Sequence, residues 1–260
     1  MTLEERMKLY YEFPYKNYLT RRTPVIVRVD GKAAHTYTKG LYKPFDEVFV
    51  NAMLAATYKL CEEAQGCVLA YTQSDEISLI LLDYQSIDTD AWFGYNVNKL
   101  VSICASVATA HFNNAFKIYA QNALGMMSST ETSDELYAKR YKALNICQRN
   151  FLLFDARAFN IPKEEVCNYL IWRQNDARRN AISSLARSCF SQKEIFGKSS
   201  SELIEMMSNK GVSFDGKPDI FKRGACYTKK NGKWNSDIHI PVFSSEEGNS
   251  YVNSLIYVGE

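Results

Sequence analysis

The amino-acid sequence predicts an α+β fold in which helices back an antiparallel sheet, with strands and helices in the order βαββαβ. Short apolar runs rich in β-branched and aromatic residues supply the strands, and polar turn residues follow them. Between them lie long segments whose apolar residues recur at helical spacing. With 260 residues and 46% hydrophobic content, the chain is long enough to bury a substantial core.

The first strand is expected over residues 24–29 (PVIVRV), because this run is β-rich and is followed by Asp30 and Gly31, which favour a turn. The first long helix is expected over residues 50–61, where apolar side chains return every three or four positions. Gly66 follows this helix, and glycine is the residue most often found just beyond a helix C-terminus.

Two apolar β-type runs come next, at residues 67–71 and 77–82, and the polar residues between them predict a hairpin. A second helix with one apolar face is expected over residues 92–116, and a fourth strand over residues 151–159. This order of elements is the ferredoxin-like plan, which also forms the palm domain of polymerases. We therefore expect residues 1–160 to form a palm-like catalytic core.

The remaining residues, 161–260, are expected to form a helical and small β extension packed on this core. A strongly helical stretch spans residues 162–190, and a shorter helix spans residues 201–209. Residues 221–257 contain short β-type runs with an Asn-Gly hairpin turn. Within the core, the polar run 128–133 (SSTETS) is expected to be an exposed loop.

Charge and hydropathy restrict the possible partners and locations. The chain carries 31 Lys and Arg against 29 Asp and Glu, a formal net charge of +2, so any nucleic-acid surface must be local. No apolar run reaches the roughly 18–20 residues that cross a bilayer, and the charged N-terminus does not resemble a signal peptide. A cytoplasmic protein without a membrane partner is the resulting expectation.

The seven cysteines are scattered through apolar stretches without a CxxC pair or a nearby histidine cluster. Free cysteines are among the most frequently buried residues. We therefore expect buried free thiols and no structural zinc.

Three carboxylates are candidates for the chemistry of this protein. Asp30 ends the first predicted strand, and Asp75 and Glu76 occupy the predicted hairpin turn. The first and third strands of a βαββαβ sheet are neighbours, so these carboxylates are expected to converge. Like charges at close range repel each other unless a cation is bound between them.

Magnesium is the cation that this arrangement favours. It prefers oxygen ligands and shares its coordination shell with substrate phosphates, which suits Asp30, Asp75 and the carbonyl group of Gly31. Two ions would activate the attacking oxygen and neutralise the departing pyrophosphate, as in a polymerase. Glu76 is expected to bind a metal ion or to orient its ligands. Each motif alone is also what an ordinary turn contains, and the predicted adjacency is what favours a metal site.

Basic residues indicate where phosphates would bind. Lys32, Lys39 and Lys43 follow Asp30, and Lys99 lies on the second helix; a solvated surface is the alternative for each of them. His35 is a provisional phosphate donor.

A second group of basic residues indicates an RNA-contacting surface on the C-terminal extension. Its expected members are Arg178, Arg179, Asn180, Arg187, Lys222 and Arg223. Trp172, Trp234 and Tyr227 are candidates for stacking on bases, although core packing is favoured for Trp172 because it lies on a helix.

Several of these motifs together resemble the tRNA-histidine guanylyltransferase family and its bacterial and archaeal relatives, which polymerise in the 3′-to-5′ direction. The resemblance spans residues 25–227. The motifs that carry it are Val27 to Gly31 (VRVDG) with His35, Lys43-Pro44 with Asp46, Ala70 to Glu76 (AYTQSDE), Trp92-Phe93 with Lys99 to Ser102 (KLVS), Phe154 to Arg157 (FDAR), Tyr169 to Gln174 (YLIWRQ) with Asp176, and Arg223-Gly224.

The resemblance implies a nucleotidyltransferase that binds two Mg²⁺ ions on Asp30, Gly31 and Asp75 and assembles as a homotetramer, a dimer of dimers. Its substrates would be tRNA and nucleoside triphosphates: ATP or GTP activates the 5′-monophosphate, and an incoming nucleotide then displaces pyrophosphate. The implied nucleotide-binding residues are Asp30, Gly31, Lys32, Ala33, Ala34, His35, Lys43, Asp46, Ser74, Asp75 and Lys99.

One departure from the eukaryotic pattern affects the expected substrate. Family members that add guanylate to histidine tRNA carry the block His-Ile-Asn-Asn-Leu-Tyr-Asn, whereas residues 178–184 here read RRNAISS and retain only the first Asn. We therefore expect template-dependent addition to the 5′ end of truncated tRNA. Guanylate addition to histidine tRNA is the alternative, and a nucleotide cyclase or an inactive tRNA-binding module are more distant ones.

Overall fold

The computed structural model describes residues 1–44, 46–128 and 134–257, so most of the loop predicted at residues 128–133 lies outside the described part. Its centre is a six-stranded sheet in the order β4-β1-β3-β2-β5-β6, in which every neighbouring pair is antiparallel. The strands are β1 (Val25–Gly31), β2 (Cys67–Gln73), β3 (Glu76–Leu81), β4 (Phe154–Asn160), β5 (Ala225–Lys230) and β6 (Lys233–Asp237). The first four have the predicted ferredoxin-like order, and the C-terminal strands extend the same sheet.

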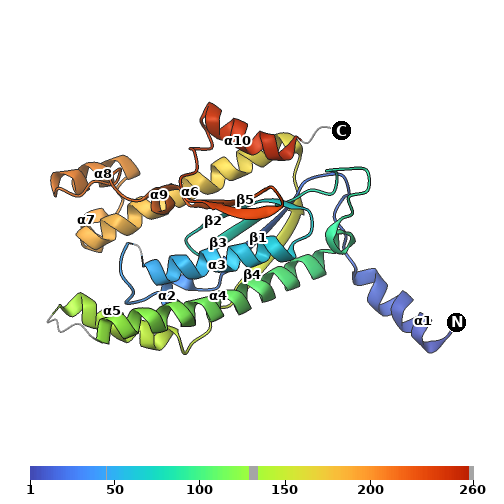
Figure 1. Ribbon diagram of the computed structural model, residues 1–260, viewed down its shortest axis with the longest axis horizontal. Helices are drawn as coiled ribbons and strands as arrows, with labels where there is room; N and C mark the ends of the chain where they lie inside the picture. Colours follow the sequence, from blue (N-terminus) through green and yellow to red (C-terminus); the bar gives the residue numbers. More distant parts are fainter. Residues whose placement is uncertain (45, 129–133, 258–260) are drawn as a thin grey trace.

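Two long helices cover one face of the sheet (Figure 1). They are α3 (Glu47–Glu63) and α4 (Val97–Ser128), and α5 (Glu135–Cys147) packs beside α4. Val25, Val27 and Val29 point to this face, because alternate residues of a strand share one side. The core beneath the helices includes Phe112 and Phe116, which are fully buried.

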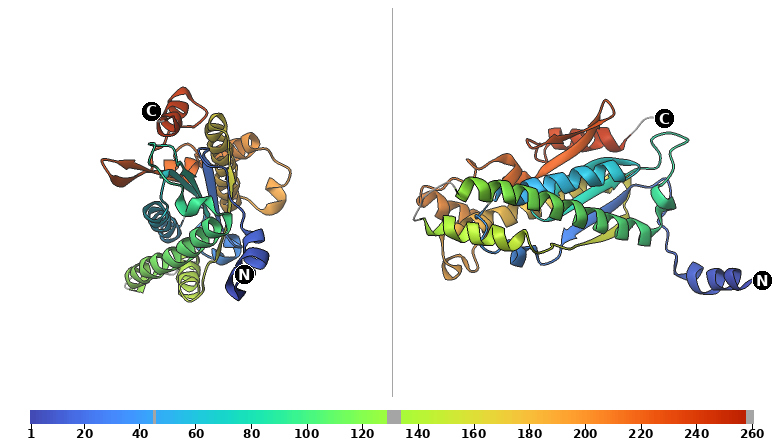
Figure 2. Two further views of the ribbon diagram at one scale, coloured as in Figure 1. Left: turned by 90° about the vertical axis from the view of Figure 1, so that its right-hand side faces the viewer. Right: turned by 60° about the horizontal axis from the view of Figure 1, so that its bottom comes forward.

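The opposite face is covered by α6 (Lys163–Cys189) and α10 (Glu246–Ile256) (Figures 1 and 2). Ile26, Arg28 and Asp30 of β1 point to this face, since they alternate with the valines. At about 1.5 Å per residue, α6 is roughly 40 Å long and projects beyond the sheet. Its C-terminal half packs against the short elements that follow it, namely α7 (Gln192–Ile195), α8 (Ser200–Asn209) and α9 (Asp219–Arg223).

The N-terminal segment extends away from the body of the molecule (Figures 1 and 2). It consists of α1 (Leu3–Met7), a π-helical turn η1 (Lys8–Glu12) and a 3₁₀ turn η2 (Phe13–Tyr15), and none of them contains a buried residue. Within the described ranges, no helix is sufficiently long and apolar to cross a bilayer. The seven cysteines are free, and all except the partly exposed Cys189 are buried.

Three expectations from the sequence need correction. The helix predicted at 92–116 begins only at Val97, because Phe93, Gly94 and Tyr95 have positive φ and form a 3₁₀ turn, η3 (Trp92–Tyr95). The helix at α5 was not predicted, although Asp134 accepts a hydrogen bond from the amide of Leu136 as an N-cap residue. Part of the β-type region at 221–257 forms the helix α10, in which Ser245 is the N-cap and accepts a hydrogen bond from the Gly248 amide.

Gly224 fixes the approach of α9 to the sheet next to the hairpin of β2 and β3. Its φ is +82°, and a Cβ atom there would lie 2.6 Å from the Thr72 carbonyl oxygen. We therefore expect Gly224→Ala to lower the free energy of unfolding by at least about 2 kcal/mol in urea denaturation. Gly125→Ala in α4 is the control, since a Cβ atom there meets nothing within 4 Å. An equal loss of stability in both variants would contradict this prediction.

Candidate functional site

Asp30, Gly31 and Asp75 meet at one end of the sheet. Asp30 is paired with Glu76 across β1 and β3, and the Gly31 amide donates a 3.0 Å hydrogen bond to the backbone carbonyl of Asp75. A Cβ atom on Gly31 would lie 3.1 Å from the Cβ atom of Asp75. The hairpin turn therefore places the Asp75 carboxylate beside the end of β1.

The environment of Asp30 disfavours its charged form. Partial burial together with the neighbouring carboxylates of Asp75, Glu76 and Asp155 raises the pKa of Asp30 to about 6, and Arg157 opposes this shift only weakly. Asp155 faces Asp30 across β1 and β4. Within the described ranges no side chain donates a hydrogen bond to the Asp30 carboxylate, since Arg157 donates to Asp155 instead.

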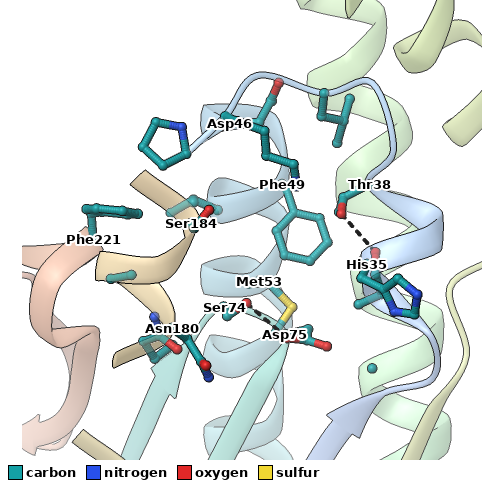
Figure 3. A pocket seen from close by; sticks show the side chains of 18 of the residues that line it. His35, Thr38, Asp46, Phe49, Met53, Ser74, Asp75, Asn180, Ser184 and Phe221 are labelled. Atoms are coloured by element: carbon teal, nitrogen blue, oxygen red, sulfur yellow. Dashed lines mark hydrogen bonds between the residues drawn. The ribbon is translucent and has the colours of Figure 1, made fainter. Parts of the chain in front are cut away.

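A cleft of about 450 Å³ lies on the α3 side of the hairpin (Figure 3). Its walls come from the segment after β1, the N-terminal half of α3, the hairpin and the C-terminal half of α6, so residues far apart in the sequence line one cavity. Among the predicted nucleotide-binding residues, it is lined by Gly31, Ala33, Ala34, His35, Lys43, Asp46, Ser74 and Asp75. Sequence reasoning missed other lining residues, namely Phe49, Met53, Gln73 and Ser184.

Asp46 supports the wall of this cleft through its own contacts. It is 6% exposed and is the N-cap of α3, where its carboxylate accepts hydrogen bonds from the amides of Tyr42 and Val48. Arg140 of α5 donates to the same carboxylate at 2.9 Å. These hydrogen bonds hold the wall of the cleft in place, and the nucleotide contact expected for Asp46 stays a prediction.

A second cleft of about 360 Å³ lies on the α6 side of the hairpin. Asp30, Glu76, Arg28 and Arg157 line it from the sheet, and Trp172 and Arg173 line it from α6. The two clefts have four lining residues in common, which are Gln73, Ser74, Asp75 and Asn180. The hairpin tip thus separates the clefts, and the Asp75 carboxylate borders both.

Glu76 is engaged by Arg173 in the second cleft. The guanidinium of Arg173 donates two hydrogen bonds of 2.7 Å to the Glu76 carboxylate and a third, of 3.0 Å, to Asp176. Such a bidentate pair ties α6 to the first residue of β3. The geometry therefore favours an orienting role for Glu76 over direct binding of a metal ion.

Three of the four predicted lysines, Lys32, Lys39 and Lys99, do not line the cleft of Figure 3. Lys99 is in the first turn of α4, where the Val97 amide donates a 2.8 Å hydrogen bond to the carbonyl of Asn17, in the segment that precedes β1. That region lies at the opposite end of the sheet from Asp75, so a single chain does not bring Lys99 to the carboxylates. Lys32 is exposed at the end of β1 and does not line the cleft.

The predicted RNA-contacting residues divide into different environments. Arg187 and Asn180 line the cleft of Figure 3, next to Lys43. Arg178 and Arg179 are exposed on α6, and Arg179 pairs with Asp176 at 2.6 Å.

Lys222 and Arg223, also predicted to contact RNA, are not free cations. Both pair with Asp219 of α9, at 3.3 Å and 2.5 Å respectively. Their positive charges are thus partly compensated within α9, which the crowding of basic residues in the sequence did not indicate.

The oxygen donors at the hairpin suit a magnesium ion whose remaining ligands come from a substrate. Asp30, Asp75 and the carbonyl of Gly31 provide hard oxygen atoms, and the raised pKa of Asp30 shows that a counter-charge would be favourable there. In the described part of the chain no set of three or more His, Cys, Asp or Glu side chains is placed to hold a metal ion. Phosphate oxygens and water would therefore complete the shell, as is usual for magnesium.

In the metal-free protein, charge repulsion at Asp30 is expected to lower the free energy of unfolding when this carboxylate is ionised. The folded state retains the Asp30 proton up to about pH 6, whereas the ordinary pKa is 3.8. Between these values the folded state binds more protons, so the contribution of Asp30 to stability falls as the pH rises. In EDTA at about pH 7.5, Asp30→Asn is expected to raise the midpoint of urea denaturation, and at about pH 3.5 the difference should vanish. A lower midpoint for the variant at neutral pH would contradict the predicted repulsion.

A ferredoxin-like sheet with carboxylates at the end of β1 and in the adjacent hairpin, next to a cleft with basic residues, defines a palm-type nucleotidyltransferase. A family profile described as tRNAHis guanylyltransferase matches residues 4–162. The chain belongs to the tRNA-histidine guanylyltransferase family.

Solved structures and sequence relatives agree with this membership. A bacterial tRNA(His) guanylyltransferase-like protein in complex with ATP is 33% identical, with a TM-score of 0.84 over 99% of this chain and 100% of that chain. A bacterial protein of the same description in complex with GTP is 32% identical, with a TM-score of 0.75 over 98% of this chain and 100% of that chain. The tRNA(His) guanylyltransferase of Candida glabrata is 25% identical over 236 residues, which cover 85% of this chain and 87% of the relative.

Proposed function

We propose that this protein adds nucleotides to the 5′ end of truncated tRNA in the 3′-to-5′ direction, with the opposite acceptor strand as template. The observation that carries the proposal is the meeting of Asp30 and Asp75 at the boundary of two clefts, which allows two substrates to approach one pair of carboxylates. The structural relatives in complex with ATP and with GTP support a triphosphate substrate.

The cleft of Figure 3 suits a nucleoside triphosphate. Lys43 and Arg187 line it from two different elements and supply positive charge for phosphates. Phe49 and Met53 of α3 supply apolar surface for a base. Ser74 donates a 2.9 Å hydrogen bond to the Asp75 carboxylate, which orients that carboxylate toward the cleft.

Two Mg²⁺ ions are proposed to bind at Asp30, Asp75 and the Gly31 carbonyl, where they would polarise the reacting phosphate and neutralise the departing pyrophosphate. The protein residues hold the reactants in line at this point, and Arg173 fixes Glu76 and thereby the start of β3. Activation of the 5′-monophosphate by ATP or GTP and attack by the incoming nucleotide are both in-line displacements at phosphorus. One site therefore suffices for both steps.

The expected assembly and location remain proposals. In a homotetramer, the exposed apolar side chains of the N-terminal segment could pack against a neighbouring subunit, since Leu3, Tyr11 and Phe13 are more than half exposed. Size-exclusion chromatography with light scattering measures the assembly. A cytoplasmic location stays a prediction.

A product assay tests the function. The protein is incubated with Mg²⁺, labelled nucleotides and a 5′-monophosphorylated tRNA that lacks its first nucleotide. We expect an RNA extended at its 5′ end with the nucleotide that pairs with the template position. A cyclic nucleotide as the product would support a cyclase, and no product at all would support an inactive tRNA-binding module.

Guanylate addition to intact histidine tRNA is the second candidate, because the family profile and the Candida glabrata relative bear that description. The departure at residues 178–184 disfavours it, and this segment contains Asn180, which borders both clefts. Faster extension of intact histidine tRNA than of truncated tRNA would make guanylate addition to histidine tRNA the favoured function.

A further inference from the structure

Trp172 of α6 is half exposed, at 50%, in the second cleft, which corrects its predicted place in the core. The guanidinium carbon of Arg173 lies 4.4 Å from the centre of its ring, and that of Arg28 lies 5.5 Å away. Tyr169 meets the ring edge-on at 5.9 Å. A large apolar side chain is thus held between two arginines in an open cleft instead of being buried.

The arginines beside Trp172 differ in how firmly they are held. Arg173 is bound to Glu76 and Asp176, and its side chain is 12% exposed. Arg28 lies across the strands from Arg157, which pairs with Asp155 at 2.8 Å. Within the described ranges no acceptor receives a hydrogen bond from the Arg28 guanidinium, which lies over the Trp172 ring. Arg28 is therefore available to an anion that enters the cleft.

The cleft reaches the same carboxylates as the proposed nucleotide site. Asp30 and Asp75 both line it, and Asp30 is two residues after Arg28 on the same face of β1. Its volume of about 360 Å³ is near the lower limit of sites for small ligands, roughly 300 Å³, which suits a single nucleotide.

We propose that the second cleft receives the terminal nucleotide of the tRNA acceptor end, with a base stacked on Trp172 and a backbone or terminal phosphate bound by Arg28. This inference rests on the proposed function and assigns the second substrate of that site. Aromatic stacking recognises any base, so it suits the ends of different tRNAs. Beyond the cleft, α6 carries the exposed Arg178 and Arg179, of which Arg179 pairs with Asp176. Basic side chains outside the cleft favour RNA, which extends past its terminal nucleotide, over a second free nucleotide.

Substitution of Trp172 shows whether this side chain contributes to binding of RNA, of ATP or of both. In the product assay with 5′-monophosphorylated, truncated tRNA, Trp172→Ala is expected to raise the KM for RNA by about 5- to 150-fold, the range for loss of one stacked base. The KM for ATP in the activation step should stay unchanged, and Trp172→Phe should retain most of the RNA affinity. Tyr141→Ala is the control, because Tyr141 is 40% exposed on α5 and lines neither cleft.

Fluorescence provides a test that does not depend on turnover. The difference in tryptophan emission between the wild-type protein and Trp172→Phe is the emission of Trp172. The truncated tRNA should quench this emission, whereas ATP should not. An unchanged KM for RNA in Trp172→Ala, a rise in the KM for ATP instead, or quenching by ATP alone would overturn the proposal. If wild-type protein binds RNA with quenching but forms no extended product, the proposed function fails and the assignment of the cleft stands.

Discussion

Replacement of Asp75 by alanine is expected to lower the rate of nucleotide addition by at least about a thousandfold, which corresponds to about 4 kcal/mol of lost transition-state stabilisation. The carboxylate borders both clefts, so its loss affects either substrate at the point where they meet. Stability should change little, because the side chain is partly exposed and its recorded hydrogen bond is to the neighbouring Ser74. Single-turnover kinetics with activated, truncated tRNA measures the effect.

The matched control is Asp90→Ala. Asp90 is also an exposed carboxylate, but it pairs with Arg21 near the start of β1, at the end of the sheet away from the hairpin. Its substitution should leave the rate within about twofold, since an exposed ion pair contributes little. Retention of more than a tenth of the rate in Asp75→Ala would remove Asp75 from the proposed metal site.

Replacement of Arg173 by alanine is expected to lower the free energy of unfolding by about 3–5 kcal/mol, because it leaves the Glu76 carboxylate largely buried without its partner. The side chains of Arg173 and Glu76 are 12% and 18% exposed, and two hydrogen bonds of 2.7 Å join them. Urea denaturation measures the loss. The rate of nucleotide addition should fall as well, since this pair holds α6 against the first residue of β3.

Two variants show whether the loss comes from the unpaired carboxylate. Arg179→Ala removes an arginine of the same helix whose side chain is 65% exposed, and it should cost less than about 1 kcal/mol. The double variant Arg173→Met, Glu76→Gln should recover part of the stability of Arg173→Ala, because no charge is then left unpaired. Equal stability of the single and double variants would contradict this explanation.

The order of the first four strands and the position of the carboxylates followed from local features of the sequence. Apolar runs that end in turn residues identify strands, and the βαββαβ order makes β1 and β3 neighbours, so Asp30 and the hairpin were expected to meet. In the antiparallel pair of β1 and β3, Asp30 lies opposite Glu76, as this order predicts. Capping residues such as Asp134 and Ser245 were local signals too, and they could have revealed α5 and α10.

The sequence by itself thus determined the first four strands of the sheet and the place of the candidate site among them, because strand, helix and turn preferences act between residues that are close in the chain. Only the tertiary structure decided how the other side chains are used. Whether Trp172 is buried, whether Glu76 is paired, and which cleft Arg187 enters depend on the packing of α6 against the sheet. Helical spacing shows which residues share a face of α6, but burial and charge pairing depend on the element that this face meets.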